Sequence, residues 1–133
     1  MIAWLVTQNF YAETMTVSDD LLFGVHAAAL ELRSRRMGMI ASNIANASTP
    51  GFKAKDIDFQ AALAQSGSNR SMTDMAIGNA TRFRVPVQAS LDGNTVELAT
   101  EQTAFAENAV AYQTTLSFLN GRIGQITRAL RGE

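Results

Sequence analysis

Residue types that could perform catalysis are sparse in this chain, and they do not cluster. His26 is the single histidine, it lies among alanines, and no acidic residue is placed to form a charge relay with it. Asp56 and Asp58 bring two carboxylates together, but the further oxygen donors and the glycine of a calcium loop are missing. We expect His26 to be a packed or helix-face residue, and the aspartates to lie in a solvated turn or beside an arginine.

The sequence also lacks the motifs that bind cofactors or activate a nucleophile. With no cysteine, it offers no disulfide, no thiolate and no cysteine-ligated metal site. It contains no glycine-rich phosphate loop after a strand, no GxSxG turn and no pair of histidines at metal-binding spacing. We therefore predict a protein that is not an enzyme, with no catalytic residues, no cofactor and no metal. An enzyme that uses His26 is a competing hypothesis.

Three arginines form a small basic patch on a predicted helix: Arg33, Arg35 and Arg36. A patch of this kind is commonly a solvated helix face. It could equally be a socket for acidic residues of another subunit, because Arg36 falls on the apolar side of the helix.

Composition favours long, closely packed helices over a globule with a bulky core. The 133 residues are 47% apolar and 17% charged, which excludes both a disordered chain and an all-apolar membrane protein. Aromatic residues are only 8%, and alanine and methionine supply much of the apolar fraction. A formal net charge of −1 provides no field to attract nucleic acid or anionic lipid. The length fits one domain.

Periodicity divides that domain into four segments: an N-terminal extension (1–18), the N-terminal helix of the core (19–47), a turn and irregular insert (48–94) and a C-terminal coiled-coil helix (95–133). The extension begins with an apolar run that lacks the basic flank and cleavage site of a secretory signal peptide. No run approaches the roughly 18 apolar residues that span a bilayer. We expect the extension to dock on a partner or to remain disordered until it does.

The first helix is expected to begin after Ser18, whose side chain can cap the free N–H groups. Pro50 and Gly51 end it in a turn, because proline cannot continue a helix and glycine accepts positive φ. The insert that follows is expected to be irregular and partly disordered, with a short helix over residues 59–64 and an extended stretch over residues 82–87.

The last third of the chain has the most regular pattern. Apolar residues at spacings of three and four continue from Leu98 to Leu130, which is a heptad seam of about four repeats. Asn94 to Glu97 resembles a capping box, which predicts a helix start near Thr95. The predicted coiled-coil seam of the two helices consists of Leu22, Val25, Leu32, Met39, Phe105, Tyr112, Leu116, Leu119, Ile123, Ile126 and Leu130.

Charges favour an antiparallel arrangement of the two long helices. Each exposed ion pair contributes only about 0–1 kcal/mol, so such pairs select orientation more than they supply stability. The expected pairs are Asp19 and Asp20 with Arg128 and Arg131, and Glu31 with Arg122.

Two asparagines stand one helical turn apart where the first helix ends. Asn43 and Asn46 share a face, so their amides can tie the last turn to the loop that follows. An ordinary helix C-terminus would show the same pattern, and residue chemistry alone favours that simpler interpretation.

The segment Ser42-Asn-Ile-Ala-Asn-Ala-Ser-Thr-Pro-Gly-Phe52 resembles the N-terminal signature of the bacterial flagellar rod, hook and hook-associated axial proteins. Residues 53–59, 91–96 and 112–123 resemble rod members of that family in particular. The resemblance covers about residues 20–133. It implies an all-α fold in which long N- and C-terminal helices form an antiparallel coiled coil, joined by the insert.

The resemblance also implies a function. The chain would be a structural subunit of the proximal rod of the flagellar basal body, forming with other rod proteins a helical tube that transmits torque from motor to hook. It would reach the periplasmic space through the flagellar type III export apparatus, which uses no cleaved signal peptide. Another rod protein of the same family, or a non-flagellar helical module on a membrane surface, is the alternative.

The implied partners are copies of itself, other rod proteins, the adaptor between rod and membrane ring, and the type III export gate, with no nucleic acid and no small-molecule substrate. The resemblance places the signature at subunit contacts. The interface residues it implies are Asn43, Ile44, Asn46, Thr49, Pro50, Gly51 and Phe52.

Overall fold

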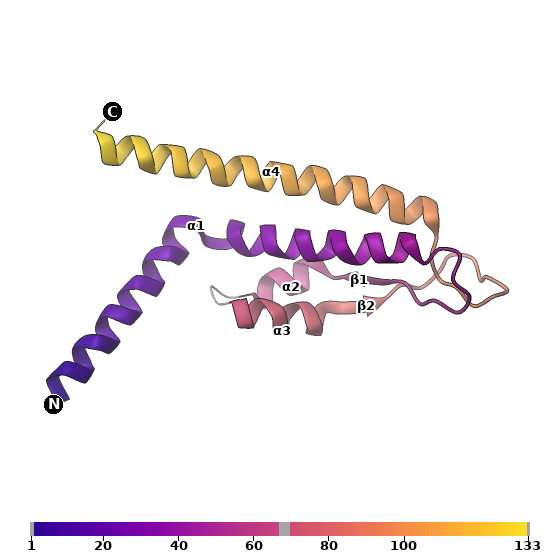
Figure 1. Cartoon of the computed structure of the whole chain (residues 1–133), viewed down its shortest axis with the longest axis horizontal. Helices are drawn as coiled ribbons and strands as arrows, with labels where there is room; N and C mark the ends of the chain where they lie inside the picture. The colour runs from indigo at the N-terminus through magenta and orange to yellow at the C-terminus, as the bar shows by residue number, and fades with distance from the viewer. Residues whose placement is uncertain (1, 67–69, 133) are drawn as a thin grey trace.

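The chain folds into a long helical hairpin with a small helical and two-stranded insert. The computed structural model describes the backbone of residues 2–66 and 70–132, and side chains within 23–66 and 72–132. The elements are α1 (Ile2–Ala45), β1 (Lys55–Ile57), α2 (Phe59–Gln65), α3 (Arg70–Ala80), β2 (Thr81–Phe83) and α4 (Leu98–Arg131). The expected fold of two long antiparallel helices in contact is confirmed (Figure 1).

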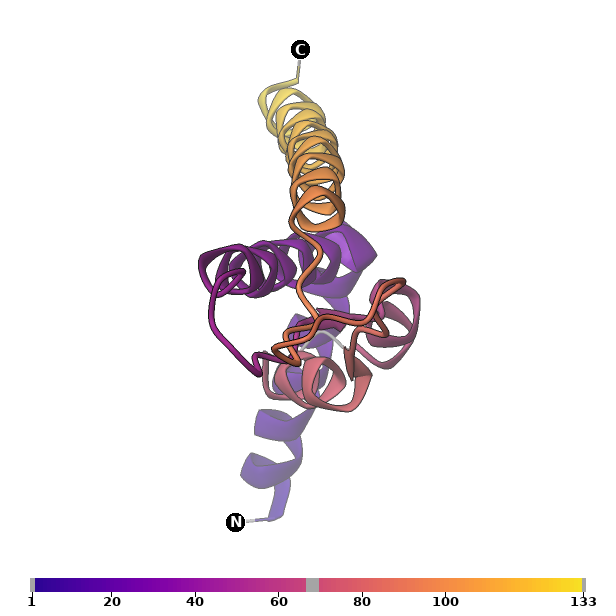
Figure 2. The same cartoon turned by 90° about the vertical axis from the view of Figure 1, so that its right-hand side faces the viewer.

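Helix α1 lies between α4 and the insert. Figure 2 shows α4 on one side of α1 and the α2–α3 pair with its strands on the other. The strands pair antiparallel, with Lys55 opposite Phe83 and Ile57 opposite Thr81. This arrangement lets β1 contact the end of α1 directly, and it brings the loops after α1 and before α4 together at one end of the hairpin (Figure 1).

The start of α1 differs from the expectation. Helical backbone runs from Ile2 through Ser18, so the predicted N-cap at Ser18 is wrong. The interruption falls instead at Gly24, with φ 47° and ψ −142°, a conformation open to glycine because it has no Cβ. Before this residue the helix leads away from α4 (Figure 1). One glycine therefore separates the N-terminal arm from the hairpin.

The insert is more regular than predicted. The short helix is confirmed as α2, whose N-cap Asp58 accepts a hydrogen bond from the Ala61 N–H at 3.1 Å. Helix α3 was not predicted, because its sequence is polar and contains Gly78. It is stabilised by small residues in contact with the rest of the insert, Ala76 and Ala80 being buried.

The apolar core is small and lies between α1 and the insert. Leu32 of α1 is completely buried against Ile57, Ala62 and Ala80. Half-buried apolar residues surround this cluster: Met39, Phe59, Ala61, Leu63 and Ile77. The insert thus covers one side of α1, while α4 packs on it with a different set of residues.

The register of the hairpin also differs from the prediction. The Asn108 amide donates to the Arg33 carbonyl at 2.8 Å, and the His26 ring stacks on Phe118 at 6.1 Å between centroids. Arg122 therefore lies beside Gly24, and Glu31 binds Arg35 in its own helix at 2.9 Å. The predicted Glu31–Arg122 pair is wrong, because an exposed glutamate gained a local partner one turn away. The side chains of Asp19 and Asp20 lie outside the described residues.

Candidate interaction site: a polar clamp at the hairpin end

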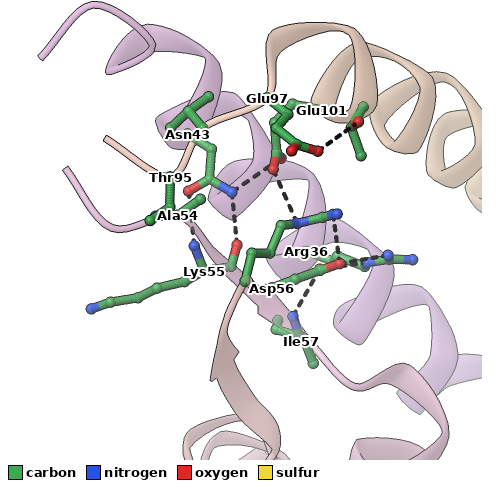
Figure 3. Close-up of polar contacts among 12 residues, drawn as sticks. Arg36, Asn43, Ala54, Lys55, Asp56, Ile57, Thr95, Glu97 and Glu101 are labelled. Carbon is green, nitrogen blue, oxygen red and sulfur yellow. Dashed lines mark hydrogen bonds and ion pairs between the residues drawn. The ribbon is translucent and has the colours of Figure 1, made fainter. Parts of the chain in front are cut away.

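Asn43 joins three elements at the end of α1. Its side chain is 1% exposed, and its Nδ2 donates to the Lys55 carbonyl at 2.7 Å and to Glu101 Oε2 at 3.1 Å (Figure 3). Its Oδ1 accepts from the Lys55 N–H at 3.2 Å. The amide therefore completes the backbone hydrogen bonding of β1 and holds it against α1 and α4.

Three ion pairs extend this contact into a network. Arg36 binds Asp56 through two hydrogen bonds of 2.8 Å, the bidentate geometry that gives strong and directional pairing (Figure 3). Arg84 binds the same carboxylate at 2.8 Å and approaches Glu101 Oε1 at 3.0 Å. Two guanidinium groups thus face two carboxylates, and their charges cancel. We call Arg36, Asn43, Asp56, Arg84 and Glu101 the polar clamp.

The polar clamp sets the protonation of Asp56. Burial alone would raise the pKa of this carboxyl, but the Arg36 hydrogen bond and charge, the Ile57 N–H and the Arg84 charge outweigh it. The pKa of Asp56 therefore lies below its ordinary value. The carboxylate stays ionised at neutral pH, so both arginines keep their partner.

Acid is expected to weaken the fold through Asp56. A carboxyl whose folded pKa is depressed stabilises the protein fully above its unfolded pKa of about 4, and the stabilisation disappears as pH falls through the folded value. At pH 7 we expect the free energy of unfolding of wild type to exceed that of Asp56→Asn by about 2 kcal/mol, and we expect this difference to disappear below about pH 4. Urea unfolding at several pH values measures the difference. Asp74→Asn, at an exposed carboxylate, is the control, and a pH-independent gap contradicts the prediction.

The arginine patch is explained by contacts within the chain. Arg36 belongs to the polar clamp, and Arg35 binds Glu31 and Asp74. The Arg33 guanidinium lies 4.2 Å from the centroid of the Phe59 ring, a cation–π contact. The expectation of an arginine beside Asp56 is confirmed, and the acidic partners of this patch come from the same chain.

A second asparagine closes the end of α1. Asn94 is 6% exposed, and its Nδ2 donates to the carbonyls of Asn46, Ala47 and Thr49 at 2.9–3.0 Å. These are the carbonyls that a helix end leaves free. The capping box predicted for α4 is wrong, because the amide of Asn94 is committed to α1 and α4 begins three residues after Thr95, at Leu98.

The signature residues are buried, half-buried or exposed according to their position. Asn43 faces inward, and Asn46 donates to the Ser42 carbonyl while accepting from the Thr49 hydroxyl, so it ties the last turn to the loop as expected. Thr49, Pro50 and Gly51 are exposed. Ile44, Asn46 and Phe52 are half-buried. As a set of subunit contacts, the signature remains a prediction.

The face of α4 toward α1 is polar at its most buried positions. Glu101, Asn108 and Thr115 are at most 8% exposed and recur every seven residues. Sequence reasoning missed all three, although this heptad spacing was readable. Of the predicted seam, Leu32 is buried and Met39 packs on the core, whereas the remaining described residues are half-buried or exposed: Val25, Phe105, Tyr112, Leu116, Leu119, Ile123, Ile126 and Leu130. The Leu22 side chain lies outside the described residues.

Neither a metal site nor a membrane span is found in the described part of the chain. No three acidic, histidine or cysteine side chains gather there as ligands, and Asp58 is used as a helix cap. His26 is exposed on the face of α1, as expected of a helix-face residue. None of the described helices is both long and apolar enough to cross a membrane.

Part of the chain matches a known protein family. A family model described as "Flagella basal body rod protein" matches residues 23–53, the segment that runs from the Gly24 break through α1 and its closing loop. The matched segment therefore points to the class of rod proteins of the bacterial flagellum.

Relatives along nearly the whole chain identify the family within that class. The flagellar basal body rod protein FlgB of Cereibacter sphaeroides is 50% identical, over 90% of this chain and 100% of the relative. The FlgB of Aeromonas hydrophila is 41% identical over 90% and 99%, and that of Escherichia coli K12 is 40% identical over 77% and 88%. The chain belongs to the FlgB family of flagellar basal body rod proteins. It is a structural subunit of the rod and not an enzyme.

Proposed function

We propose that the chain assembles with copies of itself and with other rod proteins into a helical tube, as part of the proximal rod, and that this tube transmits torque from motor to hook. One observation carries the proposal. The hairpin buries polar residues of α4 against α1 and leaves large apolar side chains of α4 exposed, among them Val110 at 68% and Phe118 at 65%. Exposed apolar side chains of this size are typical of a surface that neighbouring subunits cover.

The signature loop supplies a second contact surface in this proposal. Asn43 and Asn94 fix the loop from inside, so Thr49, Pro50 and Gly51 are presented in one conformation at the end of the hairpin. We propose that these exposed residues touch neighbouring subunits, while Asn43 acts indirectly by positioning them. The rod-to-ring adaptor, the export gate beneath the rod and export without a cleaved signal peptide belong to the same proposal, by resemblance to axial proteins.

The test separates folding from assembly. Val110→Asp places a charge at an exposed apolar position of α4, so we expect unchanged helix content and a free energy of unfolding within about 0.5 kcal/mol of wild type. In cells we expect loss of swimming and loss of the chain from purified basal bodies, because burying an unpaired charge at a subunit contact is costly.

The matched control is Asn120→Asp, which adds the same charge at an exposed polar position of α4. It is expected to retain swimming and incorporation. Normal rods containing Val110→Asp would overturn the assignment of Val110 to a subunit contact.

A further inference from the structure

A groove of about 850 Å³ is lined by residues of α1, α2 and α4. Helices α4 and α2 flank α1 on its two sides (Figure 2), and the α4 wall of the groove extends from Ala106 to Phe118, about 18 Å of helix. Val110 and Phe118 on this wall are exposed, and α2 contributes half-buried Leu63. An apolar cavity of about 150 Å³ holds one benzene-sized group, so this groove has room for the apolar face of a short helix.

Arg33 lies in this groove and forms no ion pair within the described part of the chain, unlike Arg35 and Arg36 of the same patch. Its guanidinium lies over the Phe59 ring, and its Nε is buried without a hydrogen-bond acceptor. Burial and the charge of Arg36 lower the pKa of Arg33, so its charge is held at a cost to the isolated chain. The buried donor is therefore available to an anionic group that enters the groove.

The other charged and titratable side chains of the groove leave Arg33 unmatched. His26 and Glu107 also line it. His26 is exposed and stacks on Phe118. Glu107 is exposed, lies beyond ion-pair distance of Arg33 and acts through its charge on Arg36. The polar clamp behind the groove contains two guanidinium groups and two carboxylates, which already neutralise one another.

The described acids of the chain do not supply the missing anion. Apart from Glu107, each one already accepts a hydrogen bond or an ion pair from its own chain, namely the two acids of the polar clamp and Glu31, Asp58, Asp74, Asp92 and Glu97. Glu107 of a second copy would meet Arg33 only in a two-fold symmetric pair of grooves, which closes on itself and does not extend a tube. The anion is therefore expected from a different protein.

We propose that the groove binds an amphipathic helix of a different rod protein, and that a carboxylate on this helix pairs with Arg33. Leu63, Val110 and Phe118 receive its apolar face, whose side chains recur every three and four residues as in other helices that bind in grooves. The two oxygens of the carboxylate bind Nε and one Nη of Arg33, a bidentate geometry that fixes the register. The inference rests on the proposed function, because it names the chemistry of one partner in the rod.

Arg33→Met tests whether the charge serves the partner or the fold. Methionine keeps an unbranched stem against Phe59 and relieves the unpaired charge, so the midpoint of urea unfolding of the isolated chain is expected to stay at or above the wild-type value. In purified basal bodies, quantified by immunoblotting, we expect about tenfold less of this variant than of wild type. Arg33→Lys keeps the charge and is expected to reach about half the wild-type amount.

Arg35→Met is the matched control, because Arg35 pairs with Glu31 and Asp74 of its own chain. This variant is expected to lower the urea midpoint slightly and to be incorporated at the wild-type level. Stability and assembly are thus expected to respond in opposite ways at the two positions.

Carbodiimide coupling identifies the carboxylate directly. Arg33→Lys places an amine where the guanidinium was, and a carbodiimide joins an amine to a carboxylate in contact with it, forming an amide with loss of water. After treatment of basal bodies that contain this variant, peptide mass spectrometry is expected to find position 33 joined to an acidic residue in a helix of a different rod protein. Arg35→Lys is expected to be joined only to Glu31 or Asp74 of its own chain.

Three outcomes overturn the proposal. The first is a wild-type amount of Arg33→Met in basal bodies, or a urea midpoint as low as that of Arg35→Met. The second is coupling of position 33 only to Glu107 of the same chain, or no coupling. The third is coupling to Glu13, Asp19 or Asp20, which would assign the groove to the N-terminal segment of a second copy.

These outcomes are distinct from a failure of the proposed function. In each of them the wild-type chain is still found in basal bodies, so assembly into the rod stands and only the partner of the groove changes. Absence of the wild-type chain from basal bodies would refute the proposed function itself.

Discussion

Glu101→Gln is expected to lower the free energy of unfolding by about 3 kcal/mol. The Glu101 side chain is completely buried, where it pairs with Arg84 at 3.0 Å and accepts from Asn43. Glutamine keeps the size but removes the charge, so Arg36 and Arg84 are left with only Asp56 between them. Removing one partner of a buried pair costs about 3–5 kcal/mol, and Arg84, 23% exposed, recovers part of this from water.

Urea unfolding followed by circular dichroism measures this loss, with Glu107→Gln as the matched control. Glu107 lies in the same helix and is exposed, so its substitution is expected to change the free energy of unfolding by less than about 0.5 kcal/mol. Equal effects of the two variants would show that the polar clamp does not stabilise the fold.

Asn43→Ala is expected to lower the free energy of unfolding by about 2–3 kcal/mol. The substitution removes both hydrogen bonds to the Lys55 backbone and leaves Glu101 Oε2 without its amide donor. Buried polar groups that lose their partners retain their desolvation cost, about 1–3 kcal/mol for each group that water cannot reach. Equilibrium unfolding measures the loss in the free energy of unfolding. In the variant we also expect the backbone amides of β1 to exchange faster with solvent than those of α2.

The control for Asn43 is Asn120→Ala, an exposed asparagine in the interior of a helix. Alanine is the better helix former, so this variant should be neutral or slightly stabilised. A second check is the double variant of Asn43 and Glu101, whose loss should be smaller than the sum of the single losses because the residues share a hydrogen bond. Full additivity would contradict their coupling.

Local patterns were sufficient to predict the hairpin. Helical periodicity gave both long helices, and Pro50 with Gly51 located the end of α1 to within a residue or two. The break at Gly24 was missed because a glycine within an apolar helical stretch is compatible with either continuation or interruption. Helix α3 was missed because its burial comes from contacts with α2, which the sequence of α3 does not reveal.

Only the α1 half of the candidate site could be predicted from the sequence. The signature pointed to Asn43 and its loop, but its partner Glu101 is 58 residues away, and Asn94 lies 48 residues from the Asn46 carbonyl it binds. Spacing along one helix does not identify which face meets the other. Apolar and polar residues form two neighbouring heptad rows on α4. Apolar periodicity indicates the first row, which the hairpin leaves partly exposed, whereas the polar row is the one buried against α1.

The two asparagine contacts across the hairpin also resist motion along its axis. Asn43 reaches Glu101 near one end, and Asn108 reaches the Arg33 carbonyl about three turns away. If α4 slid past α1 by one turn, about 5.4 Å, both hydrogen bonds would break together and apolar residues could not replace them. A purely apolar interface would offer equivalent packing after such a step. Shear along the helices is therefore opposed at discrete points, and a lengthwise load passes from one helix to the other without slippage.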